Sequence, residues 1–327
     1  MAKIHFDKDT DIEPLVKLNI GIIGYGNQGR AQALNLRDSG LTVWVGSRDG
    51  SPARAQAERD GFPPHSVQEV ANNCEVLALL LPDEAVPTVY VDAVEPYLEA
   101  HDTFVFAHGF TVRHKTVRLP DDADIVLVAP TGPGRQLRSL YEEGKGLPAL
   151  VAVEQDASGI AWSRGLAYAK AIGCTRAGVI ETTFEEETIT DLYCEQAVLC
   201  GGIPELIKAA FHTLVERGYQ PELAYISCLK EVKLIADLLF ERGIDGMRVA
   251  ISNTAKYGSA LAGPELVNGA TVDRLNSILS DIESGEFARR FLAEAEQGMP
   301  TIKELIAQER HSRLARTGRE LQNSLHF

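Results

Sequence analysis

Three glycines near the start of this chain of 327 residues have a spacing that could bind a phosphate. Gly24, Gly26 and Gly29 are spaced G-x-G-x-x-G after the apolar run 20–23, and a predicted helix follows from Arg30. The first glycine permits a tight turn, the second lets a pyrophosphate approach the backbone, and the third lets helix and strand pack closely. The free N–H groups at the start of the helix favour an anion. The pattern predicts a dinucleotide site, with a plain glycine turn as the alternative.

The end of the next predicted strand, residues 42–47, indicates which nicotinamide cofactor binds. An acidic side chain at this point commonly binds the ribose 2′-hydroxyl of NAD, whereas an arginine accommodates the 2′-phosphate of NADP. In this chain Arg48 comes first and Ser51 follows in the loop. A guanidinium beside a hydroxyl suits a phosphate, so the sequence favours NADPH over NADH. Asp49 opposes this prediction, because its carboxylate would repel a phosphate or bind a ribose itself.

Carboxylates in the second half of the chain have the spacing of a metal site. Asp191 and Glu195 stand four residues apart on a predicted helix and so share one face. Glu231 interrupts an otherwise apolar predicted helix, and a buried carboxylate needs a partner or a metal. Carboxylates that project from facing helices hold hard divalent cations such as Mg²⁺. A solvated acidic face is the alternative, and the spacing alone does not exclude it.

The elements that must position these residues alternate between strand and helix over the first half of the chain. Strands are predicted at residues 42–47, 75–81, 103–107 and 124–129, candidate edge strands at 149–154 and 178–180, and helices at 66–73, 85–99 and 158–172. This alternation of apolar strands and helices is typical of an α/β fold with a doubly wound parallel sheet. Ligands bind beyond the carboxyl ends of such strands, so Asp83, His108 and Thr131 are predicted to face one crevice. His108 is then either a catalytic or a structural histidine.

The second half of the chain is predicted to be helical. The helices cover residues 186–200, 203–217, 221–242, 271–284 and 287–297, with ends at Gly201, Gly202, Gly218 and Gly243 and a charged, frayed helix from Gln308. The helix 221–242 is apolar nearly all round and is predicted to be buried. Ser252 lies in a loop or caps a helix. We predict a dinucleotide-binding domain at 1–182 and an all-helical substrate, metal and dimerisation domain at 183–327.

Composition restricts the class of protein. The net charge of −14 disfavours nucleic acid or an anionic membrane surface as the main partner. The five cysteines form no C-x-x-C pair, which favours reduced thiols in a cytoplasmic protein over disulfides or zinc. The first residues have no apolar core of a signal peptide, and the longest uninterrupted apolar runs, such as residues 76–81, are too short to span a bilayer.

Several motifs together resemble one family, the short-form ketol-acid reductoisomerases. They are IIGYGNQG at 22–29, FAHGF at 106–110, VEQDASG at 153–159, IETTF at 180–184, EQAVLCGG at 195–202 and ISN at 251–253. The resemblance covers essentially the whole chain in order and spacing. It implies a Rossmann-type domain followed by a knotted helical domain, assembled as homodimers or larger rings. It also implies NADPH, Mg²⁺, and migration of an alkyl group in an acetohydroxy acid followed by ketone reduction, in branched-chain amino-acid biosynthesis.

The resemblance assigns roles residue by residue. It implies cofactor contacts at Tyr25, Gly26, Asn27, Gln28, Gly29, Arg48, Ser51, Asp83, Glu84, Ala85, Val86, His108 and Gly134. It implies an active-site histidine at His108, catalytic metal ligands at Asp191, Glu195 and Glu231, and substrate contacts at Ser252 and at the altered positions Thr131 and Ser227.

This chain departs from the family pattern at the residues that do chemistry. Thr131 replaces a lysine that carries a proton, and Ser227 replaces a fourth carboxylate. Arg30 and Arg135 stand where histidine is common, and Ala53 replaces a second loop serine. Losing a carboxylate weakens the binding of a second Mg²⁺, and losing an ammonium removes a proton carrier. Alkyl migration needs both, whereas hydride transfer needs a positioned nicotinamide and one acid or Lewis acid.

The sequence therefore predicts an NADPH-dependent reductase with one or two Mg²⁺ ions and an impaired isomerase step. Its small-molecule substrate would be a ketone, a 2-keto acid or a C=N bond, as for an imine reductase. One alternative is a genuine ketol-acid reductoisomerase that tolerates both replacements. A second alternative is a non-catalytic homologue that binds the cofactor.

Overall fold

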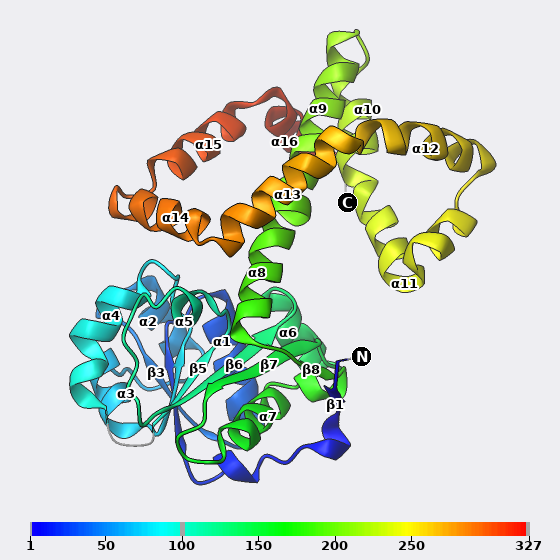
Figure 1. Cartoon of the computed structure of the whole chain (residues 1–327). Helices are drawn as coiled ribbons and strands as arrows, with labels where there is room; N and C mark the ends of the chain where they lie inside the picture. Colours follow the sequence, from blue (N-terminus) through cyan, green and yellow to red (C-terminus); the bar gives the residue numbers. More distant parts are fainter. Residues whose placement is uncertain (1, 99–101, 325–327) are drawn as a thin grey trace. The chain divides into compact units, whose positions relative to one another are not determined.

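The computed structural model describes residues 2–98 and 102–324 and divides the chain into two compact units. The first unit is Met1–Thr190 and the second is Asp191–Phe327. The first contains a β-sheet with helices and the second is helical, which confirms the predicted fold class (Figure 1). The boundary falls within helix α8, Phe184–Cys194, which is one continuous helix.

The first unit is built on an eight-stranded sheet in the order β1-β8-β7-β6-β5-β4-β2-β3. Its strands are β1 Ile4–His5, β2 Asn19–Ile23, β3 Thr42–Gly46, β4 Val76–Leu79, β5 Thr103–Phe106, β6 Asp124–Pro130, β7 Ala149–Gln155 and β8 Val179–Glu181. The five strands from β3 to β6 are parallel, as predicted. β7 is antiparallel to β6, and β1, which was not predicted, is antiparallel to β8, so the sheet as a whole is mixed.

Helices cover both faces of this sheet (Figure 1). They are α1 Asn27–Asp38, α2 Pro52–Arg59, α3 Val67–Asn73, α4 Val86–Ala93, α5 Phe110–Arg113, α6 Gly134–Glu142 and α7 Ala161–Ala171. Successive strand residues enter opposite cores: Ile22 packs with residues of α1 and α7, whereas Ile23 packs with residues of α3 and α4. This alternation follows from the pleat of a strand that is buried on both faces.

The predicted helix at 85–99 is wrong in its extent. α4 ends at Ala93, and a 3-10 turn follows at Glu95–Tyr97. Pro96 lies in that turn, and its ring and missing N–H prevent the α-helix from continuing. Residue 99 lies outside the described residues.

The second unit is helical throughout its described part. After α8 come the π-helical turn η5 Glu195–Leu199, α9 Gly202–Glu216, α10 Pro221–Tyr225, the π-helical turn η6 Ile226–Lys230, α11 Val232–Ala250, α12 Asn253–Leu266, α13 Gly269–Glu283, α14 Glu286–Glu296, α15 Pro300–His311 and α16 Arg313–Ser324. The predicted break at Gly201 and Gly202 is confirmed, because η5 ends at Leu199 and α9 begins at Gly202. The predicted end at Gly243 is confirmed as a kink with non-helical backbone (φ of 69°, ψ of −178°) that separates two helical stretches of α11, and α12 was not predicted. The tail forms two helices, α15 and α16, rather than one frayed helix.

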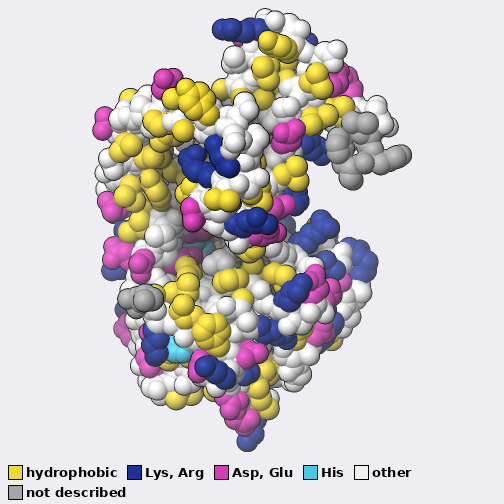
Figure 2. All heavy atoms as spheres, turned by 90° about the vertical axis from the view of Figure 1, so that its right-hand side faces the viewer, with side chains coloured by type: hydrophobic (Ala, Val, Ile, Leu, Met, Phe, Trp, Pro, Cys, Tyr) yellow, Lys and Arg dark blue, Asp and Glu magenta, His cyan; other side chains and the backbone are white. Residues whose placement is uncertain are grey.

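The prediction that the helix from Pro221 is buried is wrong for this chain by itself. None of the described residues of α11 is buried, and Phe240 is 91% exposed. The buried apolar cluster of this unit consists of Phe211, Val215, Ala224, Tyr225 and Leu321. Hydrophobic side chains are visible at the surface in Figure 2. One helical run, Phe184–Glu216, has 33 residues and is by length and composition apolar enough to cross a membrane, although it contains no uninterrupted apolar run of that length.

Candidate active site

The predicted strand, turn and helix of the glycine motif are confirmed as β2, the turn 24–26 and α1. Gly24 has φ of +100°, and a Cβ there would lie 2.6 Å from the carbonyl oxygen of Leu80. A Cβ on Gly29 would lie 1.9 Å from the carbonyl oxygen of Gly24. Both positions therefore require glycine, and the turn leaves the N-terminus of α1 accessible to an anion.

The turn after β6 contacts the glycine motif, which follows β2, at the carboxyl edge of the sheet. A Cβ on Gly134, the first residue of α6, would lie 2.0 Å from the carbonyl oxygen of Asn27. The side-chain amide of Gln28 donates a hydrogen bond of 2.9 Å to the carbonyl oxygen of Gly132. The structure therefore brings together the cofactor residues predicted on the turn after β2 and on the turn after β6.

A cavity of about 320 Å³ opens beside the glycine turn within the first unit. Its lining includes Asn27, Asp83, Val86, Ala107 and His108, together with apolar residues at the ends of β4 and β5. Of the other residues predicted nearby, Ala85 forms the N-cap of α4 and Glu84 is exposed in the turn before it. The cavity places polar side chains over the carboxyl ends of parallel strands, where ligands bind in such folds.

A second cavity of about 320 Å³ lies at the end of β3 and is lined by Ser47, Arg48 and Asp49, among others. Arg48 is exposed and forms no ion pair with any residue that the structure describes. Arg54 instead forms an ion pair with Asp49 and lies 3.6 Å from the carboxylate of Glu58. Ser51 caps α2 and accepts a hydrogen bond of 3.1 Å from the backbone N–H of Arg54. Arg48 is thus the cation available to a phosphate at this strand end.

Thr131 is held by the backbone and does not carry a titratable proton. Its hydroxyl and its backbone N–H each lie 2.9 Å from the carbonyl oxygen of Pro148, which accepts from both. The hydroxyl is therefore committed as a donor to a neutral acceptor. A threonine in this arrangement supplies neither the charge nor the proton transfer of an ammonium group.

His108 lies beyond β5 between acidic side chains. Its Nδ1 is 3.2 Å from a carboxylate oxygen of Asp83, a contact that fixes the orientation of the imidazole. The next residue, Gly109, donates its backbone N–H to the buried carboxylate of Glu187 at 2.7 Å. A Cβ on Gly109 would lie 2.3 Å from the hydroxyl of Thr188, so α8 can approach this turn only because the residue is glycine. Burial lowers the pKa of nearby His114, which keeps that imidazole neutral near pH 7.

These side chains form a group that could hold a cation. One ligand atom from each of His108, Glu187 and Asp191 lies within 4.8 Å of the others. Glu187 and Asp191 stand one turn apart on the single helix α8, so their carboxylates repel each other unless a cation or a proton lies between them. The two carboxylates suit a hard divalent cation such as Mg²⁺, whereas an imidazole nitrogen is not a ligand that such a cation prefers.

Glu187 was missed by the sequence analysis. Its distance of four residues from Asp191 is the same signal that singled out Asp191 and Glu195, but it lies in a run of three glutamates. Only the structure shows that this one of the three is 3% exposed and bonded to Gly109.

The remaining predicted site residues lie at irregular points of the second unit. Glu195 is the first residue of the π-helical turn η5, Ser227 lies within η6, and Glu231 follows η6 directly. Both π-helical turns of the described chain therefore coincide with predicted site residues, and such turns are frequent at functional sites. Ser252 forms the N-cap of α12, accepting a hydrogen bond of 3.2 Å from the N–H of Ala255.

Comparison with known proteins identifies both halves of the chain. The model of the acetohydroxy acid isomeroreductase NADPH-binding domain matches residues 14–178, and that of the ketol-acid reductoisomerase C-terminal domain matches residues 184–327. A solved NADH-preferring ketol-acid reductoisomerase from an uncultured archaeon has 39% sequence identity and a TM-score of 0.96, covering 99% of this chain and 100% of its own.

More distant structures share only the fold. A semialdehyde dehydrogenase NAD-binding protein from Cupriavidus necator has 18% identity and a TM-score of 0.63, over 82% of this chain and 99% of its own. A pyrroline-5-carboxylate reductase from Coxiella burnetii has 16% identity and a TM-score of 0.55, over 82% of this chain and 98% of its own. At these identities the likeness carries no argument about the substrate.

Proposed function

The chain belongs to the ketol-acid reductoisomerase family of NAD(P)H-dependent oxidoreductases, and from that premise we propose that it reduces a ketone, a 2-keto acid or a C=N bond with its isomerase step impaired. The observation that carries this proposal is Thr131, whose hydroxyl donates to the carbonyl of Pro148 at a position where the family has a lysine. Ser227 supports it, because a hydroxyl replaces a carboxylate that would help to hold a second dication.

The residues of the first unit support hydride transfer. The glycine turn and Gly134 hold the cofactor, and the cavity beside them extends to His108, where the nicotinamide and the substrate would meet. Asp83 orients His108 so that the imidazole can hold or release a proton at the reduced oxygen or nitrogen. Asp191, with Glu195 and Glu231 as the further residues implied by the family, would hold Mg²⁺, which would supply a Lewis acid for the developing negative charge.

The substrate panel is the direct test. Purified protein is assayed with NADPH on acetolactate with Mg²⁺, on a 2-keto acid and on a cyclic imine. We expect reduction of a keto acid or an imine, with rearrangement of acetolactate at least about 100-fold slower than that reduction. Normal turnover of acetolactate would contradict the proposal.

A genuine ketol-acid reductoisomerase is the second candidate, favoured by the identity of 39% over nearly the whole chain. Thr131→Lys combined with Ser227→Glu distinguishes the two candidates. If the isomerase is impaired, the double variant should gain acetolactate rearrangement; if it is intact, little should change. Thr213→Lys is a matched control, because the Thr213 hydroxyl also donates to a backbone carbonyl, that of Ala209 at 2.9 Å. Cofactor binding without hydride transfer to any acceptor would indicate the third candidate, a non-catalytic homologue.

We propose NADPH as the preferred cofactor, because Arg48 is the exposed cation without an ion pair among the described residues of the cavity at the end of β3. The archaeal relative is described as NADH-preferring, and Asp49 would favour NADH in this chain also. Arg48→Gln should lower the ratio of kcat/KM for NADPH to that for NADH by about 10-fold, the value of one charge-assisted contact. Arg59→Gln is the control, since Arg59 donates to Gln56 on α2.

We also propose that the protein is a cytoplasmic homodimer or a larger homo-oligomer that binds neither nucleic acid nor membrane. The apolar residues exposed on α11, including Phe240, need a cover that the chain itself does not supply in the described residues. The apolar residues of the run Phe184–Glu216 also need a cover, which we propose to be a second copy of the chain rather than a membrane. The run has three acidic residues in its first turn and belongs to the matched C-terminal domain. Light scattering of the purified protein tests the assembly.

A further inference from the structure

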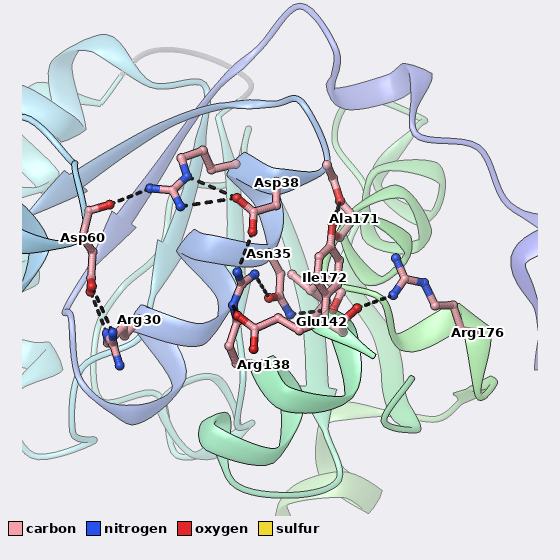
Figure 3. Close-up of polar contacts among 12 residues, drawn as sticks. Arg30, Asn35, Asp38, Asp60, Arg138, Glu142, Ala171, Ile172 and Arg176 are labelled. Carbon is pink, nitrogen blue, oxygen red and sulfur yellow. Dashed lines mark hydrogen bonds and ion pairs between the residues drawn. The ribbon is translucent and has the colours of Figure 1, made fainter. Parts of the chain in front are cut away.

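One carboxylate ties the glycine turn to the neighbouring helix α2. Asp60, which directly follows α2, accepts a hydrogen bond of 2.9 Å from the hydroxyl of Tyr25 at Oδ2. Arg30 donates to the same carboxylate twice, from Nε to Oδ2 at 2.6 Å and from Nη2 to Oδ1 at 2.9 Å (Figure 3). The side-chain amide of Gln56 adds a fourth donor at 3.1 Å. All four interactions lie within the first unit.

The two main donors belong to the glycine turn itself and to the helix that follows it. Tyr25 lies within the turn, between Gly24 and Gly26, and Arg30 lies in the first turn of α1. The Tyr25 ring is 5% exposed and packs edge-on against Phe62 with ring centroids 5.9 Å apart. Asp60 therefore ties the turn, through Tyr25, to the first turn of α1, through Arg30, and packing against Phe62 holds the Tyr25 ring in place.

The charges of this cluster keep the arrangement intact across neutral pH. The bidentate contact with Arg30 holds the pKa of Asp60 well below its usual range, so the carboxylate is ionised. Burial, together with the hydrogen bond to Asp60, raises the pKa of Tyr25, so the phenol keeps the proton that it donates. The Asp60 side chain is 12% exposed, which limits competition from water.

The same helix reaches the other end of the predicted cofactor site. α2 starts at Pro52, immediately after Ser51 and the loop that carries Arg48, and ends next to Asp60. The backbone carbonyl of Asp60 also accepts a hydrogen bond of 2.6 Å from Arg37 near the end of α1. A displacement of Asp60 would change the position of the glycine turn relative to the loop 48–51, which is predicted to contact the ribose of the cofactor.

We propose that Asp60 is a positioning residue for the nicotinamide cofactor, acting through Tyr25 and Arg30 to hold the phosphate-binding turn in its binding conformation. Asp60 does not line either cavity described above, so it sets the affinity without touching the cofactor. The inference rests on the proposed use of this turn for NADPH. In this proposal α2 supports the glycine turn through Asp60 at one end and follows the loop 48–51 at its other end.

The first experiment compares Asp60→Ala with Asp38→Ala. Asp38 is a matched control because it is also a partly buried carboxylate bonded to an arginine, accepting from Arg138 at 2.6 Å, but at the far end of α1 (Figure 3). The Kd of NADPH is measured by fluorescence titration, together with Tm and with kcat at saturating cofactor. Asp60→Ala should raise Kd about 10-fold with kcat within about twofold, whereas Asp38→Ala should leave Kd within about twofold at a similar loss of Tm.

The second experiment is a double-mutant cycle on the same Kd. Tyr25→Phe removes only the hydroxyl that Asp60 holds, and it should raise Kd about threefold in the wild-type background and have no effect in Asp60→Ala. Should Asp60→Ala fail to fold, Asp60→Asn takes its place in both experiments.

Three results would overturn the inference: an unchanged Kd in Asp60→Ala, equal rises in Kd for Asp60→Ala and Asp38→Ala, or additive effects in the cycle. Wild-type protein that binds neither NADPH nor NADH would instead overturn the proposed function, on which the inference rests.

Discussion

The two units of this chain bury their apolar residues to very different degrees. In the first unit both faces of the sheet lie against helices, and large side chains such as Phe104 and Tyr168 are fully buried. The second unit has one small buried cluster around Phe211, while α11 buries none of its described residues. A unit that leaves so much apolar surface exposed loses the main contribution to its own stability. The first unit is therefore expected to be stable by itself, and the second to require a partner copy.

The largest effect is expected in the core of the first unit. Phe104 is completely buried and packs against Tyr90 with ring centroids 6.1 Å apart. Phe104→Ala should lower the free energy of unfolding by about 3–5 kcal/mol, because it removes a large side chain and leaves a cavity. Urea unfolding measures this value, with oligomer size as the control that should not change. A loss below about 1 kcal/mol would mean that this core is not well packed.

A substitution on the second unit should act on assembly instead. Phe240→Asp places a charge on apolar surface that we expect a partner copy to cover, so the dissociation constant of the oligomer should rise at least about 100-fold, equivalent to about 2.7 kcal/mol. Analytical ultracentrifugation measures it. Val91→Asp is the matched control, because Val91 is 54% exposed on α4 of the first unit. Equal assembly in both variants would remove the distinction between the units.

A substitution in the turn after β5 would show how rigid the first unit is at the site. In Gly109→Ala the new methyl group would meet the hydroxyl of Thr188 and the carbonyl of Phe184, which lie 2.3 Å and 2.8 Å from the Cβ position. The start of α8 must then move, and the hydrogen bond from Gly109 to Glu187 must lengthen. We expect kcat/KM for the reductase reaction to fall about 100-fold, as for a displacement of about 1 Å near reacting groups. Gly258→Ala is a control at an exposed glycine of α12 with open space and no positive φ, and unchanged kinetics in Gly109→Ala would show that the site is adaptable.

The smallest effect concerns the acid side of the stability profile. The pKa of Asp60 is lowered from its usual 3.8, so its contribution to stability is fully present above that value and is lost as the pH falls through the lower folded pKa. Asp60→Asn should therefore cost about 1 kcal/mol at pH 7, and the difference from wild type should shrink below about pH 4. Urea unfolding at a series of pH values measures the difference. A difference that stays constant down to pH 2 would show that charge is not its cause.

Local features of the fold could be predicted, because they depend on neighbouring residues. The glycine turn and the parallel strands follow from backbone geometry and apolar pattern within short segments. The helix before Gly201 was predicted only in its extent, because an apolar pattern does not indicate that its last residues form a π-helical turn. The burial of the helix from Pro221 failed because an apolar pattern does not indicate whether the cover comes from the same chain.

The site shows the same division between local and distant information. Residue types and order were sufficient to place the chain in its family, because motifs are short, whereas the roles of His108, Asp191 and Thr131 stay predictions. Only the tertiary structure selected Glu187 from three consecutive glutamates and joined Asp60 to Tyr25 and Arg30. Those contacts join residues that are far apart in the chain. They depend on tertiary packing, because the partners of a carboxylate are determined by how the helices and strands lie against one another.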